Sequence, residues 1–286
     1  MNKIHIFFFL FIIFSYIYYM PDIIEPTEKL IRKIKYDKLI DYLKTINPSM
    51  YNKKINLNIA TKIDFDNFYK IYKSFIKKPS HEQKNILKNK IDIVNKLLSL
   101  SINWKILISK NNLEGAMPFT IDNYVILPDK LINSVSIITL LHEKIHILQR
   151  NNQNEFNKLY KQLYPFLYLM KDHNIIPNEL DKINMTNPDS NNTYWIYYIH
   201  NRLWLPLLVY DKNSNSFKEH AYPIVFNKRI IIDIYNPTDL KKLIPYMDNR
   251  ISLYHPNEIF ACSVSYDIIE KRPIDDRILK LLNNYK

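Results

Sequence analysis

The chain has 286 residues, of which 47% are hydrophobic and 24% are charged, a balance that favours a globular protein with a sizeable core over a disordered one. Its single glycine, Gly115, excludes glycine-rich phosphate loops and dinucleotide fingerprints, and its single cysteine, Cys262, excludes a disulfide framework and a cysteine-type zinc module. The net charge of +12 invites a nucleic-acid partner, but the lysines are scattered through every segment, so we expect no specific nucleic-acid binding.

The first residues form an apolar run. Residues 4–20 are almost entirely hydrophobic, and Pro21 ends them. As a helix they would span about 25 Å, slightly less than the hydrocarbon core of a bilayer at about 30 Å. We expect residues 1–20 to be a hydrophobic signal-anchor segment, a single-pass membrane anchor whose orientation the flanking charges leave open. No pair of small residues precedes Pro21, which disfavours a cleaved signal peptide; if the segment is cleaved, the protein is secreted.

Residues 21–100 carry apolar residues at three- and four-residue spacing, which predicts a helical N-terminal region. The expected helices cover residues 27–46, 64–78 and 81–100. Two extended segments rich in apolar residues follow and predict strands over residues 103–109 and 124–127.

The sequence His-Glu-Lys-Ile-His stands inside an apolar run that predicts a helix over residues 133–151, capped by Ser134. His142 and His146 are four residues apart and share one helical face, so their imidazoles can bind one zinc ion. Glu143 lies close enough to take a proton from a zinc-bound water. The helix is apolar on nearly all sides and should be buried, where a metal would satisfy all three polar side chains. The alternative is a helix whose histidines only form hydrogen bonds in a core.

The second half of the chain mixes helical and extended patterns. A helix kinked at Pro165 is expected over residues 154–172, and the polar stretch 174–193 predicts a long loop or boundary. The following patterns predict strands over 194–199, 203–210, 221–226 and 230–234 and helices over 238–247, 256–269 and 275–284. The expected fold class is α+β, mostly helical with a small mixed sheet.

A catalytic zinc ion needs a third protein ligand and keeps its fourth position for water. Glu179 and Glu258 both follow a Pro-Asn pair. After Glu179 the chain soon becomes Asn-rich, whereas more than three helical turns follow Glu258, with small residues on the face of the glutamate. Small residues let this helix approach the first one closely, and a packed helix holds a ligand rigidly. We therefore favour Glu258, with Glu179, His200, His220 and His255 as alternatives.

His-Glu-x-x-His on a buried helix, followed later by Pro-Asn-Glu-Ile-Phe-Ala, resembles the zincin metallopeptidases, specifically the branch with a glutamate third ligand that includes thermolysin. The segment Gly-Ala-Met-Pro-Phe-Thr-Ile-Asp-Asn-Tyr-Val-Ile-Leu-Pro stands where such proteins keep a sheet-edge strand that pairs with substrate. The A/T-biased composition is similar to that of uncharacterised predicted peptidases of large DNA viruses. The resemblance covers residues 115–150 and 254–270 and implies a zincin-like metallopeptidase region over 101–286.

The resemblance implies a zinc-dependent peptidase that acts on a peptide or protein substrate. Zn2+ held by His142, His146 and Glu258 would lower the pKa of its water to about 7 and polarise the scissile carbonyl. Glu143 would act as general base and pass the proton to the leaving nitrogen. A further His or Tyr usually stabilises the oxyanion, and the candidates are Tyr254, His255, His200 and Tyr197.

Two alternatives remain for the function. The chain could be a zinc hydrolase of another amide or ester, or a degenerate zincin that serves as a membrane-tethered binding or virion structural protein. An intact Glu143 favours an active enzyme, because a scaffold needs no general base. The sequence leaves the oligomeric state and the cleavage specificity open.

Overall fold

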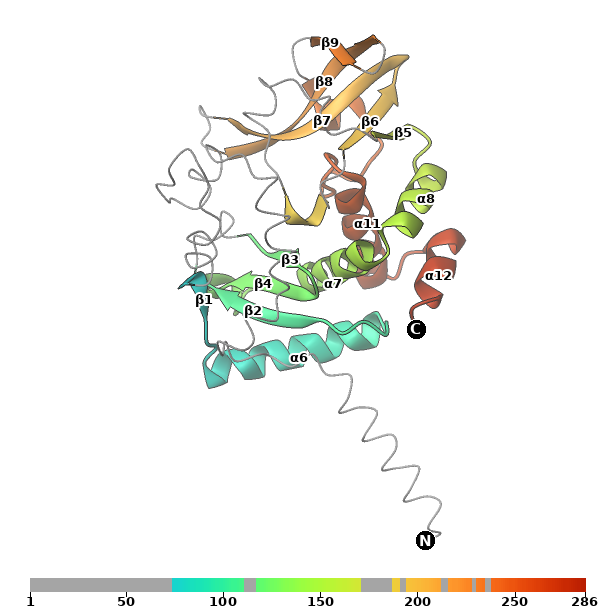
Figure 1. Cartoon of the computed structure of the whole chain (residues 1–286). Coiled ribbons are helices and arrows are strands. Elements are labelled where there is room, and N and C mark those ends of the chain that lie inside the picture. The colour runs from blue at the N-terminus through green and yellow to red at the C-terminus, as the bar shows by residue number, and fades with distance from the viewer. Residues whose placement is uncertain are drawn as a thin grey trace.

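The computed structural model describes residues 74–110, 117–170, 187–190, 194–211, 216–227, 230–234 and 238–286. These residues form a mixed α/β fold with two sheets, and the helix that carries His-Glu-x-x-His lies between them (Figure 1). The expected signal-anchor segment and the helix over 27–46 lie outside the described residues. No helix within the described ranges has the length and apolar character needed to cross a bilayer.

The first sheet has four strands in the order β1-β2-β4-β3, which are β1 (Ile76–Lys77), β2 (Lys105–Ser109), β4 (Tyr124–Pro128) and β3 (Phe119–Ile121). β2 and β4 run parallel, whereas β1 and β3 run antiparallel to their neighbours. The predicted helix over 64–78 is wrong at its end, because Ile76 and Lys77 pair with β2 as a strand. β3 is an edge strand among the described residues, at the position where the sequence places a substrate-pairing strand.

Helices α6 (His81–Leu97) and α7 (Ile137–Asn151) share a core with this sheet. Alternate residues of the parallel strands lie on one face, where Ile106 pairs with Val125 and Ile108 with Leu127, and all four are buried in that core. Inside α7, the buried ammonium of Lys144 donates to the carbonyl of Leu98 and to Asn95 in α6, which fixes the two helices against each other.

Helix α7 begins later than the sequence suggests. Ser136, not Ser134, caps it, because the Ser136 hydroxyl accepts a hydrogen bond from the backbone nitrogen of Thr139 at 3.0 Å. The hydroxyl of Ser134 instead donates to the carbonyl of Leu131. Residues 133–136 are therefore a turn that leads into the helix.

Helix α8 (Gln153–Leu163) follows α7 after one residue, Asn152. The predicted helix over 154–172 is wrong in its second half, because α8 ends before Pro165 and strand β5 (Leu167–Met170) follows. Proline offers no backbone donor and its ring opposes the preceding helical turn, so here it ends the helix instead of kinking it.

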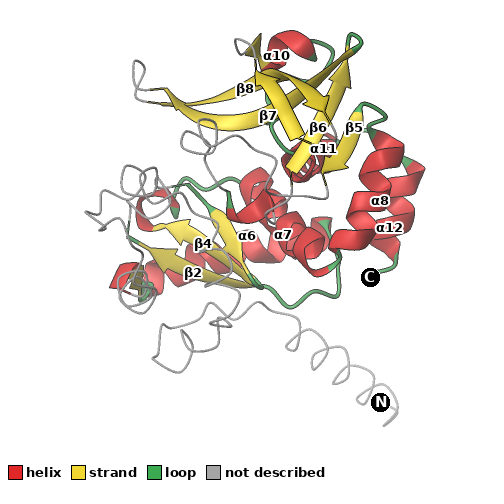
Figure 2. Cartoon of the chain, turned by 45° about the horizontal axis from the view of Figure 1, so that its top comes forward, coloured by secondary structure: helices red, strands yellow, loops and turns green. Residues whose placement is uncertain are grey.

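The second sheet has six strands in the order β10-β8-β7-β6-β5, with β9 paired to β8. Its further strands are β6 (Tyr194–Ile199), β7 (Arg202–Asp211), β8 (Ser216–Asn227), β9 (Ile230–Ile234) and β10 (Thr238–Asp239). The predicted combination of helices and sheet is confirmed, but the prediction of one small sheet is wrong, because the described residues form two sheets. The predicted helix over 238–247 is also reduced to β10 and the short α10 (Leu240–Leu243). Figure 2 shows this sheet above α6 and α7, with α10 at its upper side.

A tight turn without glycine joins β6 and β7. His200 and Asn201 occupy it with φ of 52° and 60°. Two consecutive positive φ values match the two-residue hairpin turn that suits the twist of paired strands, and asparagine tolerates this region better than most residues. His200 thus has a turn position on the surface of the second sheet.

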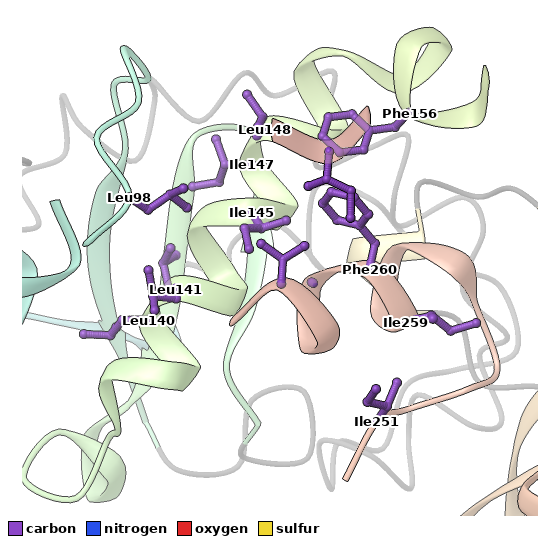
Figure 3. Close-up of a cluster of buried hydrophobic side chains, with 14 of the residues drawn as sticks. Leu98, Leu140, Leu141, Ile145, Ile147, Leu148, Phe156, Ile251, Ile259 and Phe260 are labelled. Carbon is purple, nitrogen blue, oxygen red and sulfur yellow. The ribbon is translucent and has the colours of Figure 1, made fainter. Parts of the chain in front are cut away.

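Helix α11 (Pro256–Glu270) lies against α7, and the shorter α12 (Asp276–Asn283) ends the described chain. Part of the contact between α7 and α11 is apolar, and Figure 3 shows Ile145 and Leu148 of α7 in one cluster with Phe260 of α11 and Phe156 of α8. The two phenylalanine rings meet edge to face at 5.2 Å between centroids. Of the small residues expected on this helix, Ala261 and Ser265 are fully buried, whereas Cys262 is half-buried and lines a cavity.

Candidate metal centre

Helices α7 and α11 bring three of the predicted site residues together. Nε2 of His142 lies 2.8 Å from Nε2 of His146. The two carboxylate oxygens of Glu258 lie 3.3 Å from Nε2 of His142 and 3.4 Å from Nε2 of His146. Ligands at about 2.0–2.1 Å from a tetrahedral zinc ion are about 3.3–3.4 Å from one another. The distance from each imidazole to its nearer carboxylate oxygen matches this value, whereas the two imidazole nitrogens lie closer together than two zinc ligands do.

The start of α11 explains why Glu258 can reach this point. Pro256 occupies the first helical turn, where a missing N–H has no cost, and His255 caps the helix by accepting from the backbone nitrogen of Asn257. Glu258 then falls in the first turn, where the positive end of the helix dipole favours a carboxylate.

Two overlapping groups of side chains in the described residues could hold a metal ion, and both contain Glu258. One adds His142 and Cys262, and the other adds His146 and Asp189, with all ligand atoms of each group within 4.8 Å of one another. Asp189 already has partners, because its Oδ1 accepts from the backbone nitrogen of Thr120 at 3.1 Å and pairs with Arg150 at 3.2 Å. Glu258 faces both imidazoles and is therefore the better third ligand.

Gln149 orients the imidazole of His146 from one turn further along α7. Its amide oxygen lies 2.7 Å from Nδ1 of His146 and can only accept, so Nδ1 carries a proton and Nε2 keeps its lone pair for a metal. The amide nitrogen of Gln149 donates to the hydroxyl of Tyr160 at 2.9 Å and to the carbonyl of Asn257 at 3.0 Å. This buried network joins α7, α8 and α11 directly behind the metal centre.

The other two ligands have partners of their own. Sγ of Cys262, one turn after Glu258, lies 3.6 Å from Nδ1 of His142. Asn187 donates from its side-chain nitrogen to Glu258 at 3.0 Å and also bonds the hydroxyl of Tyr254, which itself lies 3.4 Å from the same carboxylate oxygen. These contacts hold Glu258 in the orientation that meets both imidazoles.

The electrostatics of the centre favour bound positive charge. Burial alone would raise the pKa of Glu258, but the imidazoles of His146 and His142 lower it well below its usual value. Burial would lower the pKa of both imidazoles, yet Cys262 and Glu258 raise that of His142, and Asp189 and Glu258 raise that of His146. The carboxylate therefore prefers its anionic form, and the imidazoles acquire a positive charge more readily than usual, so the surroundings of the centre favour a bound cation.

Glu143 is buried beside this centre without a matching donor. Its Oε2 has no hydrogen-bond partner among the described residues. Burial first and the nearby charge of Asp189 second raise the pKa of Glu143 to about 8, against the opposing effect of the two imidazoles. A carboxyl group in such surroundings binds a proton readily, which is the property that a general base near a metal requires.

The centre opens into a cavity of about 520 Å3, a volume typical of ligand-binding pockets. His142, Glu143 and Glu258 line it, together with Met117, Pro118 and Phe119 at the start of β3. The metal centre and the edge strand therefore share one cavity.

The candidate oxyanion stabilisers and the alternative third ligands differ in burial and in position relative to the cavity. Tyr254 lines the cavity, and burial raises the pKa of its hydroxyl well above the usual value. Tyr197 is buried and donates to the carbonyl of Leu253 at 2.5 Å. Three of the alternatives belong to neither group of metal ligands: His255 caps α11, His200 lies in the exposed β6–β7 turn, and the ring of His220 is tilted at 6.4 Å from that of Tyr222 in β8. Glu179 lies outside the described residues.

Comparison with known proteins gives no relative. The chain matches no protein-family model, no curated protein and no solved structure. The resemblance to zincins therefore stays an expectation from the motifs, and the site is described by its own geometry.

Sequence reasoning missed the residues that support the ligands. Asn187 and Asp189 lie in the polar stretch 174–193, which the sequence presents as a loop, yet Asp189 is buried in a short 3-10 turn against the metal centre. Gln149 carried a signal, since it falls three residues after His146 in the same apolar helix, where a buried amide needs a polar partner.

Proposed function

We propose that the protein is a zinc-dependent metallopeptidase in which His142, His146 and Glu258 hold the ion and Glu143 is the general base. The observation that carries the proposal is the convergence of two imidazoles and one carboxylate beside a second, unpartnered carboxylate at the wall of a cavity. Two histidines and one glutamate are a ligand set of catalytic zinc, whereas structural zinc sites use four protein ligands, mostly cysteines.

When bound, zinc supplies a Lewis acid that activates a water molecule and polarises a carbonyl group. Glu143 accepts the proton of the attacking water and passes it to the leaving nitrogen, so the base must stay off the ion and close to the cavity, as its position allows. Tyr254 is protonated near neutral pH, as an ordinary tyrosine is, and burial raises its pKa further, so its hydroxyl can donate to the developing oxyanion.

The wall of the cavity supports a peptide as the substrate. Met117 and Phe119 line the same cavity as Glu143, so an extended peptide that lies along this wall would pass the base and the ligands. The residues of β3 are buried, and the backbone N–H and C=O of Thr120 already bond Asp189 and Arg150, so the peptide would contact this wall without pairing with β3. Arg150 ties this strand to the metal helix, because its guanidinium donates to the carbonyl of Thr120 at 2.9 Å.

Two glutamate variants test the proposal, because the two glutamates have different tasks. Glu143→Gln should keep one zinc ion per chain and lose about 100- to 10,000-fold of its peptide hydrolysis, the usual contribution of a general base. Glu258→Gln should lose zinc and activity together, and added zinc should restore part of both. Glu179→Gln is the matched control from the other Pro-Asn-Glu segment and should do neither.

The measurements are elemental analysis and digestion of a peptide library. Folded protein without zinc, or a Glu143→Gln variant that keeps more than about a tenth of the activity, would contradict the proposal. Zinc binding without turnover of any peptide would favour the degenerate zincin, and hydrolysis of esters or other amides alone would favour the other hydrolase class.

A further inference from the structure

The cavity beside the metal centre is acidic in a basic protein. Four carboxylates line it, from Glu143, Asp189, Glu219 and Glu258, and none of the described lining residues is a lysine or arginine, although the chain has a net charge of +12. Three of these groups have tasks in the metal centre: Glu258 faces the imidazoles, Asp189 pairs with Arg150, and Glu143 is the proposed base. Glu219 is the one of these four carboxylates that has no role in the metal centre.

Glu219 lies on β8 and brings the second sheet to the wall of the cavity. One carboxylate oxygen accepts from the Ser252 hydroxyl, and the other accepts from the backbone nitrogen of Leu253 at 2.8 Å. Both donors are neutral, and a carboxylate has about four acceptor positions, so capacity remains for a charged donor. The side chain is held in place without being neutralised.

The groups around Glu219 stabilise its ionised form only in part, so a bound cation would stabilise it further. Burial raises the pKa of its carboxyl group, and the two hydrogen bonds and the charge of Lys241 offset this only in part. The ammonium of Lys241 is itself bound to the carbonyl of Asn249. A cationic group that enters the cavity would favour the ionised form of Glu219 and form a charge-assisted hydrogen bond with it.

The remaining walls suit the stem of a long basic side chain. Apolar and aromatic residues line the same cavity, namely Met117, Phe119, Ile138, Leu208, Tyr254 and Tyr266. Lysine and arginine place a chain of methylene groups against apolar surface and keep the charged end in a polar environment. An apolar wall with one fixed carboxylate matches both parts of such a side chain.

We propose that Glu219 determines specificity by binding a lysine or arginine side chain of the substrate next to the scissile bond. This inference rests on the proposed peptidase function and adds the chemical class of its substrates. Because the carboxylate is fixed by Ser252 and Leu253, it recognises the cation in one place and so sets which peptide bond reaches the base.

The test uses the full chain loaded with zinc and pairs of N-acetylated peptides that differ only in lysine or acetyl-lysine at one position. Acetylation removes the charge and keeps the stem. The kcat/KM of the wild type should be about 10- to 100-fold higher for the lysine peptide, and Glu219→Gln should abolish most of this ratio. Glu219→Lys should favour a glutamate peptide. Ser252→Ala is the matched control, since it keeps the charge of Glu219 and its hydrogen bond from Leu253 and removes only the bond from Ser252, so most of the ratio should persist.

The possible failures are distinguishable. A wild type that cleaves both peptides equally, or a Glu219→Gln variant that lowers cleavage of both by the same factor, would show that Glu219 only anchors residues 252 and 253. A preference found only with free N-termini would assign the carboxylate to an α-ammonium group and overturn the inference. Binding of both peptides to zinc-loaded Glu143→Gln, followed by fluorescence anisotropy, tests the same preference without turnover. Equal affinity there overturns the inference, whereas absence of turnover alone overturns the proposed function.

Discussion

Replacement of Gln149 by leucine should weaken metal binding although Gln149 is not a ligand. The side chain is buried and makes three hydrogen bonds, to His146 at 2.7 Å, to Tyr160 at 2.9 Å and to the carbonyl of Asn257 at 3.0 Å. Each buried polar group left unpaired costs about 1–3 kcal/mol. Tyr160 keeps its bond to the side chain of Asn257 at 2.8 Å, so the total loss of unfolding free energy should be on the order of 3–5 kcal/mol.

The zinc affinity should fall by about 10- to 100-fold, the usual effect of removing a partner that orients a ligating histidine. Competition with a chromophoric chelator measures this affinity, and urea unfolding with and without zinc measures the stability. Gln149→Glu separates the two effects, because its carboxylate still accepts from His146 but offers no donor to Tyr160 or Asn257. It should keep most of the zinc affinity and lose stability. If Gln149→Leu binds zinc within about twofold of the wild type, the orienting role is refuted.

Three further perturbations test other parts of the structure. Burial lowers the pKa of Lys144 from 10.5 to about 7, so in this window the unfolded chain binds a proton that the folded chain does not. The unfolding free energy should therefore rise with pH, by up to about 1.4 kcal/mol per unit, and Lys144→Met should abolish the rise in urea titrations between about pH 7 and 9. Phe260→Ala removes a fully buried ring packed on Phe156 and should cost about 3–5 kcal/mol in the same assay, with a loss under about 1 kcal/mol arguing against a tight α8–α11 contact. Arg150→Met leaves Asp189 without its cation, so peptide hydrolysis should fall by up to about 100-fold while the zinc content is unchanged; loss of zinc instead would place Arg150 in the support of the ligands.

The part of the site that could be predicted from the sequence depends on local geometry. One helical turn separates His142 from His146, so any helix through them brings the imidazoles together. Glu258 could be predicted as a ligand because Pro256 and the small residues after it identify the start of a closely packed helix. In both cases a pattern within a few residues determines the position of the side chain.

The rest depends on contacts between distant segments, which no local pattern encodes. Asp189 meets Thr120 and Arg150 across 69 and 39 residues of chain, so its burial could not be inferred from the polar residues around it. Glu219 contacts Leu253 across 34 residues of chain. The chain has many charged residues, and no local pattern in the strand distinguishes Glu219 from the others. The extent of the second sheet was underestimated for the same reason, since strand pairing is long-range and β propensity depends on context.

The ligands come from two helices that lie far apart in the sequence, and this separation determines when the metal centre forms during folding. His142 and His146 meet as soon as α7 forms, and helix formation takes about 0.1–1 μs. The residues that join α7 to α11, such as Gln149 and Asn257, are 108 residues apart, and contacts of this separation require loop closure before they contribute any stability. The centre is therefore completed late in folding, when α11 docks on α7. A growing chain that has not yet reached Pro256 carries only the two imidazoles, so it cannot assemble the candidate metal centre before the residues of α11 have been synthesised.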